Sequence, residues 1–193
     1  MSSDREGFCS WSNSHDIYIK YHDDEWGKPE FDGRKLFEML TLETFQSGLS
    51  WIIILKKRDN FKIAFDDFNP KVIAKYNNKK IKELMKDRSI VRNKKKILST
   101  INNAKIYNNK FKNSKKFSDF FWKYVDYKPI INSRKELRDI PKDTELSKKI
   151  SKKMKELGFR FCGPVIVYSF MQASGIVNDH LLSCPNYLKC QKD

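Results

Sequence analysis

Residues 158–174 read GFRFCGPVIVYSFMQAS, and this stretch decides most of what the sequence says about the fold. Pro164 suits the first position of a helix, because its missing N–H would have no partner there. The residues that follow it, up to Ser174, are nearly all apolar, which is typical of a helix buried in a core. Gly175 is a common residue just past a helix end. We therefore expect a buried helix after a tight connection bounded by glycines.

A second amphipathic helix is predicted before that connection. Its apolar residues recur at intervals of four, four and three, so they share one face, while lysines cover the other: Leu146, Ile150, Met154 and Leu157. The two helices and the turn from Gly158 to Gly163 form a helix–hairpin–helix unit. Such a hairpin can direct backbone N–H groups at a DNA phosphate without reading base sequence. The spacing alone fits an ordinary turn between packed helices at least as well.

The remaining chain shows the same helical periodicity, with no internal repeat, no linker and no competing strand pattern. Asp32 is a predicted N-cap for a helix that carries Leu36, Phe37, Leu40 and Glu43 and ends before Gly48. Further helices are predicted near 60–65, 71–76, 79–85, 94–107 and 118–124. The pattern predicts an all-α fold, built as one domain over residues 1–193 or as two helical lobes of it.

Composition limits the class of protein. The 193 residues are 39% hydrophobic with 7 Gly and 6 Pro, which indicates a folded chain. The formal net charge of +15 favours a nucleic-acid partner, although the abundance of Lys, Asn and Ile is equally what an A/T-rich genome would give. The N-terminal residues lack an apolar segment, and no stretch reaches the ~18 apolar residues of a membrane span. We expect a cytoplasmic protein that does not contact membranes.

Two cysteines and two histidines have spacings that suggest a metal site. Twelve residues separate Cys9 from His22, and three separate His180 from Cys184. Two thiolates and two imidazoles match a closed, tetrahedral structural zinc site, which would join the two ends of the chain. Unrelated buried cysteines and a surface histidine are the alternative.

The other candidate ligands are left out of this set. His15 lies in a polar run and Cys190 in a C-terminal tail. Cys162 lies within the hairpin, where we expect it to be packed and not ligating.

Glu43 shares a predicted helix face with Leu36 and Leu40, so a carboxylate falls within an apolar stripe. Aromatic residues lie near it in sequence: Trp11, Tyr18, Tyr21, Trp26 and Trp51. Aromatic faces can stack on a base extruded from a duplex, and a carboxylate can accept hydrogen bonds from its exocyclic amine while favouring a cationic base. An aromatic core in which a local donor satisfies the glutamate fits the same pattern.

With these residues assembled, the sequence resembles the DNA-3-methyladenine glycosylase I family of helix-hairpin-helix glycosylases. The resemblance runs from about Cys9 to Cys184. It is carried by CSWSNSHDIYIKYHDDEWGKPEFDGRKLFEMLTLE, QSGLSWIIILKKRDNF, IVRNKKKI and GFRFCGPVIVYSFMQASGIVNDH. The hairpin residues Cys162 and Pro164 and the short tail after Cys184 are where the sequence departs from the family pattern.

The resemblance implies a role for each candidate residue. It implies a structural zinc ion on Cys9, His22, His180 and Cys184. It implies that Glu43 is the catalytic and base-recognising acid, with Tyr21 and Trp51 as pocket aromatics and Trp11 and Tyr18 in the same substrate-binding cluster. It implies DNA contacts from the hairpin residues Gly158, Phe159, Arg160, Phe161 and Gly163.

The expected activity is that of a monofunctional glycosylase, a hydrolase that flips out and excises N3-methyladenine from alkylated double-stranded DNA in base excision repair. The segment PVIVYSFMQAS holds no lysine for a Schiff-base step, and Asp179 receives no catalytic role. No obligate protein partner is expected. The alternatives are a non-catalytic helix-hairpin-helix DNA-binding module and a zinc-stapled protein-binding scaffold.

Overall fold

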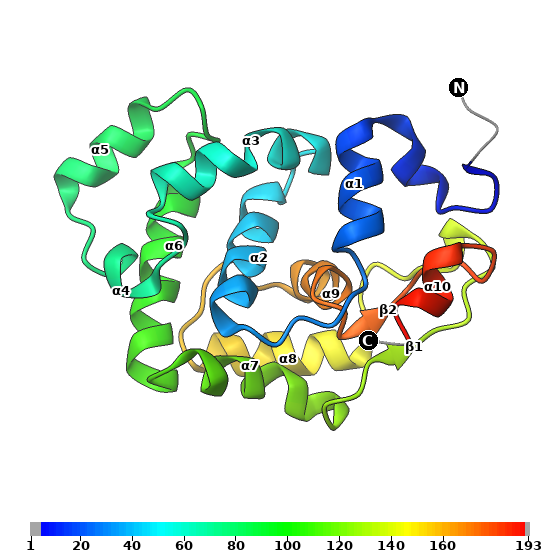
Figure 1. Ribbon diagram of the computed structural model, residues 1–193. Coiled ribbons are helices and arrows are strands. Elements are labelled where there is room, and N and C mark those ends of the chain that lie inside the picture. The colour runs from blue at the N-terminus through cyan, green and yellow to red at the C-terminus, as the bar shows by residue number, and fades with distance from the viewer. Residues whose placement is uncertain (1–4, 192–193) are drawn as a thin grey trace.

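The computed structural model describes residues 5–191, and its helices confirm the predicted all-α class (Figure 1). The α-helices are α1 (Asp16–Asp24), α2 (Gly33–Gln46), α3 (Trp51–Ala64), α4 (Pro70–Ile73), α5 (Asn78–Lys86), α6 (Lys94–Ile106), α7 (Ser114–Trp122), α8 (Glu145–Glu156), α9 (Pro164–Ala173) and α10 (Pro185–Lys189). Shorter helical turns are η2 (Ser10–Ser14), η3 (Tyr107–Phe111), η4 (Lys123–Val125) and η5 (Leu137–Asp139). Two strands, β1 (Ile130–Ile131) and β2 (Val177–Asn178), pair in parallel.

Local signals placed several helix ends correctly. The Asp32 carboxylate accepts hydrogen bonds from the N–H groups of Arg34 and Lys35, as an N-cap does. Pro164 is the first residue of α9. Gly158 follows α8 with a φ of +94°, a left-handed conformation that glycine adopts without steric strain. These predictions are confirmed. Each could be made from sequence because it depends only on residues that are close together in the chain.

Four helices differ clearly from the prediction: α3 and α7 begin earlier than expected, and α1 and α10 were not expected. α3 begins at Trp51, not near Asn60, because five consecutive apolar residues at its start hide the helical period; α3 packs against both α1 and α2. α1 was not predicted at all. Its buried residues are Tyr21 and His22, so the face that it turns inward carries no aliphatic stripe.

The larger apolar cluster, here called the central cluster, is formed by α2 to α9. α9 lies between α2 and α8 near the middle of the molecule (Figure 1). Its rings pack edge to face and tilted at short distances, such as Phe121 against Phe170 at 4.7 Å between centroids. The largest of its fully buried side chains include Phe37, Phe45, Phe61, Phe117, Trp122 and Tyr168.

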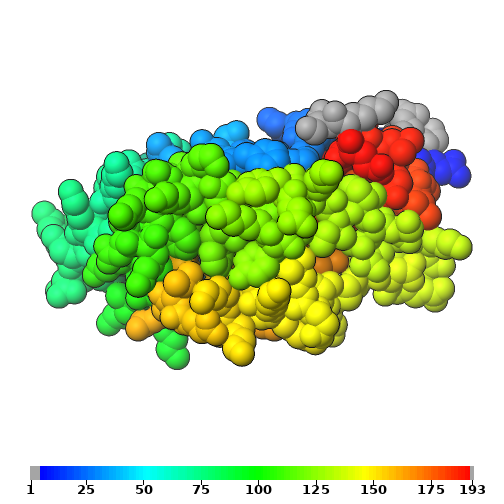
Figure 2. Space-filling view, turned by 90° about the horizontal axis from the view of Figure 1, so that it is seen from below, coloured from blue at the N-terminus to red at the C-terminus, as the bar shows by residue number. Residues whose placement is uncertain are grey.

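A smaller cluster, here called the terminal cluster, comprises Cys9, Tyr21, Trp26, Leu55, Leu181 and Cys184. It forms where the two ends of the chain meet. The segment at the blue end and α10 at the red end lie side by side at one end of the molecule (Figures 1 and 2). The Ser183 hydroxyl donates to the Gly7 carbonyl across this junction at 2.9 Å. Trp51 packs against both clusters, so it lies on their boundary.

Within residues 5–191, no helix has the length and apolar content needed to cross a membrane.

Candidate functional site

A cavity of about 370 Å³ opens at the boundary between the two clusters. Four of the five predicted substrate-binding residues lie on its wall: Trp11, Tyr21, Glu43 and Trp51. They come from η2, α1, α2 and the start of α3, so the fold brings together residues that the sequence only suggested as partners. The rest of the wall is Trp26, Gln46, Leu137, Ile140, Ser169 and Gln172.

Tyr18 is the predicted residue that does not lie on this wall. Its ring packs edge to face against Trp11, with 5.6 Å between centroids. Its hydroxyl accepts a hydrogen bond from the N–H of Ile52 at 2.8 Å, in the first turn of α3. Tyr18 therefore holds the helix end that carries Trp51.

Glu43 is the acid of the cavity. Its side chain is 5% exposed, and it makes no hydrogen bond to any residue between 5 and 191. Burial alone raises the pKa of this carboxyl from 4.5 to about 8. A carboxyl in this state is mostly neutral at pH 7. A positive charge placed in the cavity would lower the pKa and favour the anion.

Tyr21 and Trp51 face each other across the cavity wall, with 5.4 Å between ring centroids and planes tilted by 56°. Burial, with a smaller contribution from the charge of Glu43, raises the pKa of Tyr21. A flat base held between two parallel rings needs roughly 7 Å, which is two van der Waals contacts. The two rings must separate or rotate before they can enclose a base.

A partly buried ion cluster links the helices that supply these side chains. Arg58 on α3 donates to both carboxylate oxygens of Glu25 at 2.7 and 2.6 Å, and to Glu38 on α2 at 2.8 Å. Glu25 directly follows α1. One guanidinium thus joins α1, α2 and α3 behind the cavity. Sequence reasoning did not identify it, because three charged residues on three helices look like ordinary surface positions.

Sequence reasoning also missed the two α9 residues on the wall. Ser169 and Gln172 are three residues apart, so they share a face of an otherwise apolar helix. A polar pair at helical spacing within a buried helix was a usable signal for them. Leu137 and Ile140 gave no signal, because the helical turn η5 and the residue after it are too short to show a periodic pattern.

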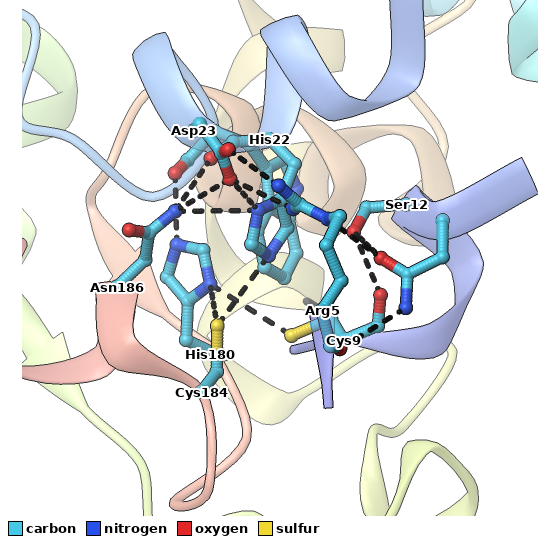
Figure 3. Close-up of polar contacts among 10 residues, drawn as sticks. Arg5, Cys9, Ser12, His22, Asp23, His180, Cys184 and Asn186 are labelled. Atoms are coloured by element: carbon cyan, nitrogen blue, oxygen red, sulfur yellow. Dashed lines mark hydrogen bonds and ion pairs between the residues drawn. The ribbon is translucent and has the colours of Figure 1, made fainter. Parts of the chain in front are cut away.

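The four predicted metal ligands come together in the terminal cluster (Figure 3). All four are buried, and their ligand atoms lie within 4.8 Å of one another. Cys184 Sγ lies 3.6 Å from His22 Nε2 and 3.6 Å from His180 Nδ1, and Cys9 Sγ lies 3.8 Å from His180 Nδ1. Tetrahedral bonds of the usual zinc lengths would place sulfur and nitrogen about 3.6 Å apart. The donor set and its spacing therefore fit zinc.

The second nitrogen of each imidazole is bound by the protein. His22 Nδ1 pairs with Asp23 at 2.7 Å, and His180 Nε2 donates to the Trp26 carbonyl at 3.0 Å. Arg5 grips the Asp23 carboxylate with two nitrogens, and that contact is the largest cause of the lowered pKa of Asp23 (Figure 3). Partners of this kind orient the histidines that bind metals.

The other three residues considered as ligands lie elsewhere. The exposed His15 caps α1, where its ring accepts from the N–H of Ile17. Cys162 is packed in the central cluster, as predicted. Cys190, which the sequence places in a C-terminal tail, is buried, with only 1% of the residue exposed. α10 folds back, so that its last turn lies against the segment at Gly27.

The hairpin between α8 and α9 turns its carbonyl groups inward. Asn102 and Asn103 on α6 donate to the carbonyls of Gly158 and Arg160 at 2.9 and 3.0 Å, and Ser151 donates to that of Cys162 at 2.6 Å. No side chain caps the N-terminus of α9, which follows Gly163. The first N–H groups of α9 therefore lack side-chain acceptors, as in anion-binding helix ends.

The predicted DNA-contacting residues of the hairpin differ in their exposure to solvent. Gly158 and Arg160 are exposed, and Phe161 and Gly163 are half-buried. Phe159 is buried in the central cluster, where it anchors the hairpin.

Known proteins similar to this chain share its length and fold. Residues 11–187 match the model of the methyladenine glycosylase family. A DNA-3-methyladenine glycosylase of Haemophilus influenzae is 48% identical over 92% of this chain and 96% of its own length. A crystal structure of a 3-methyladenine DNA glycosylase I, 44% identical, superposes with a TM-score of 0.89 over 92% of this chain and 98% of that one. A tyrosine-to-phenylalanine variant of such an enzyme, in complex with 3-methyladenine, is 35% identical with a TM-score of 0.87, over 93% of this chain and 96% of that one.

Proposed function

The chain belongs to the methyladenine glycosylase family, and from this premise we propose that it flips N3-methyladenine out of alkylated double-stranded DNA and hydrolyses its glycosidic bond. The observation that carries the proposal is the unpartnered, buried carboxyl of Glu43 within an aromatic cavity. An acid left without a protein partner in an apolar site is suited to a ligand that brings hydrogen-bond donors and a positive charge.

Cleavage of the glycosidic bond of N3-methyladenine needs little catalytic assistance from the protein. Methylation at N3 gives adenine a positive charge, so the base departs readily with the bonding electron pair and becomes neutral. Water then supplies the oxygen that bonds to C1′ and loses a proton. Binding and enclosing the extruded base is therefore the main contribution of the cavity.

Glu43 is the recognition and catalytic acid in this proposal. Its carboxyl is mostly neutral in the free protein, and it ionises when the cationic base enters. The anion accepts hydrogen bonds from the exocyclic amine and stabilises the charge of the base. Normal adenine lacks that charge, so the carboxyl stays mostly neutral and gains no charge-assisted hydrogen bond, which disfavours normal adenine.

Tyr21 and Trp51 hold the two faces of the base. Because their rings contact each other without a ligand, one ring has to move as the base enters. Trp51 is the first residue of α3, where a helix end restrains a side chain least. Trp11 and Trp26 extend the aromatic wall, and Tyr18 acts through Trp11 and the first turn of α3.

The hairpin of residues 158–163 binds a DNA phosphate in this proposal. Its inward carbonyls and the uncapped N-terminus of α9 leave N–H groups for an anion. Beside it, Lys148, Lys152 and Lys155 line a surface hollow that reaches Pro164. These cations lie where a duplex gripped by the hairpin would continue, which supports a functional share of the +15 charge.

Zinc is the metal we propose for Cys9, His22, His180 and Cys184. When bound, it supplies structural cross-links and no activated water, because four protein ligands complete its tetrahedral shell. Trp11 and Trp26 contact the ligand histidines and also line the cavity. The metal site therefore supports one aromatic wall of the base pocket.

The proposed function is tested by incubating the protein with DNA treated with a methylating agent and resolving the released bases by chromatography. We expect release of N3-methyladenine by the wild type and a loss of about 10-fold or more in Glu43→Gln, because a charge-assisted hydrogen bond is removed. Glu83→Gln, at an exposed position on α5, is the matched control and should behave as wild type. No base release by a folded, zinc-loaded protein would instead favour a non-catalytic DNA-binding module.

A further inference from the structure

We propose that Gln172 is a specificity-determining residue, whose side-chain carbonyl accepts a hydrogen bond from the exocyclic amine of the flipped base. The inference rests on the proposed function and assigns a second acceptor beside Glu43. It starts from Asp179, whose hydrogen-bond partners among residues 5–191 include one residue of the cavity wall, Gln172.

Asp179 is fully buried and is surrounded by donors. Its Oδ2 accepts from the Tyr168 hydroxyl at 2.6 Å and from Gln172 Nε2 at 2.8 Å. Its Oδ1 accepts from Asn132 Nδ2 at 2.8 Å and from Arg134 Nε at 3.0 Å. All four partners donate, so both oxygens of this carboxylate act as acceptors.

The orientation of the Gln172 amide follows from this. Because Nε2 of the amide donates to Asp179 Oδ2, the carbonyl oxygen Oε1 of the same planar group faces away from Asp179. Oε1 has no partner among residues 5–191, and Gln172 lies on the wall of the cavity that holds Glu43. Asp179 therefore makes the cavity wall present an acceptor at this position.

Gln172 is held in place by contacts of its main chain as well as of its side chain. α9 is buried between α2 and α8, and the Gln172 carbonyl of the main chain accepts from the N–H of Gly27 at 3.0 Å. The same carboxylate also holds Asn132 and Arg134, which begin the segment that brings Leu137 and Ile140 to the cavity. Asp179 is thus a positioning residue for two parts of the wall.

Two acceptors in one cavity select a particular edge of a purine. An adenine-type base carries an amine at its six position, whose two N–H groups can satisfy Glu43 and Gln172 together. A guanine-type base carries a carbonyl oxygen there, which would face an acceptor and lose its hydrogen bonds with water. We therefore infer that the pair restricts excision to methylated bases with a six-amino group.

Gln46 also lines the cavity, and its Nε2 donates to the Leu49 carbonyl, so its Oε1 is also turned away from an acceptor; its anchor, however, is a main-chain carbonyl in the turn after α2 and not a buried carboxylate. It offers a matched comparison: an amide of the same size in the same cavity, anchored to a surface turn. Gln46→Met and Gln172→Met remove the same chemical group.

The experiment measures the ratio of N3-methyladenine to N3-methylguanine released from the same methylated DNA. In Gln172→Met, we expect the rate for N3-methyladenine to fall about 10-fold while that for N3-methylguanine is unchanged, so the ratio falls about 10-fold. Asp179→Asn should also lower the ratio. The asparagine can turn its amide nitrogen toward Gln172, and the Gln172 amide can then reverse, so that its nitrogen faces the cavity in place of its oxygen. Gln46→Met should leave the ratio within about twofold.

The ratio is independent of how much protein is folded, so a partly unstable variant still gives an answer. A ratio that stays at the wild-type value in Gln172→Met, or that responds to Gln46→Met instead, would overturn the inference. Wild-type protein that releases no N3-methyladenine would overturn the proposed function itself, which is a different result.

Discussion

The two clusters of this protein are held together by different chemistry. The central cluster packs phenylalanine, leucine and isoleucine side chains around α9, and its stability follows from burial of apolar surface. The terminal cluster has few apolar residues, and it buries two thiols and two imidazoles that need partners. The chain ends thus bring together side chains that could hold a metal ion, whereas the centre is stabilised by apolar packing. The cavity that holds Glu43 lies at the boundary between the two clusters.

The largest expected effect is loss of the metal. Cys184→Ser removes one of the four ligands, so we expect loss of bound zinc and a decrease of several kcal/mol in the free energy of unfolding, because metal binding is coupled to folding. Metal analysis and thermal melting measure the two. Cys162→Ser makes the same change in the central cluster and should cost less and leave the zinc content unchanged. Equal effects of the two substitutions would show that the terminal cluster needs no metal.

The next effect is a pH dependence of stability that originates in Glu43. Burial raises its pKa from 4.5 to about 8, so the folded protein binds a proton more tightly than the unfolded chain. Stability of the wild type should therefore fall as pH rises from about 4.5 to about 8, by at most about 5 kcal/mol.

Glu43→Gln removes this titration. The variant should melt above the wild type at pH 8, and the difference should shrink toward pH 5. Glu83→Gln, on the surface of α5, serves as the control with no such trend. A constant difference between the Glu43 variant and the wild type across this range would contradict the assignment.

Substitution of Arg58 tests how much its ion cluster stabilises the helices at the boundary between the two clusters. Its guanidinium is mostly buried between Glu25 and Glu38, and Arg58→Met would leave two carboxylates facing each other. We expect a loss of about 2–4 kcal/mol in stability, since removing one partner of a buried ion pair strands the other. Base release should fall as well, because the helices carrying the cavity side chains lose their common anchor.

Two further variants check the Arg58 prediction. The double variant Arg58→Met with Glu38→Gln should recover part of the stability. Lys148→Met on α8, whose ion pairs lie at the surface, should change the melting temperature little. A melting curve for Arg58→Met that matches that of Lys148→Met would show that the ion cluster is dispensable.

The smallest effect concerns the hairpin. Asn103 bonds both the N–H and the carbonyl of Arg160, at 2.9 and 3.0 Å. Asn103→Ala should weaken binding to undamaged duplex DNA about 3- to 10-fold at fixed salt, while binding of free 3-methyladenine stays unchanged. Asn108→Ala, which removes a similar bond to the Pro70 carbonyl away from the hairpin, is the control. A loss of free-base binding in Asn103→Ala would place the effect in the cavity instead.

Prediction from sequence succeeded where the signal was local. The α2 N-cap at Asp32 and the α9 start at Pro164 were correct, since each reflects the hydrogen bonding of one helix end. It failed at α1, because that helix buries Tyr21 and His22 and carries no aliphatic stripe. The burial of Cys190 was not predicted either, because it results from the packing of α10 against the segment at Gly27, which is distant in sequence.

The sequence by itself determined most of the helices, the apolar character of α9 and the close spacing of His180 and Cys184, because backbone hydrogen bonding and helical spacing act between neighbours in the chain. The tertiary structure alone decided that Cys9 and His22 meet that pair, that Glu43 has no partner in its cavity, and that Asp179 fixes the direction of the Gln172 amide. Each of these depends on contacts between residues far apart in sequence, and burial changes the pKa and the hydrogen-bonding capacity of a group only after such contacts have formed.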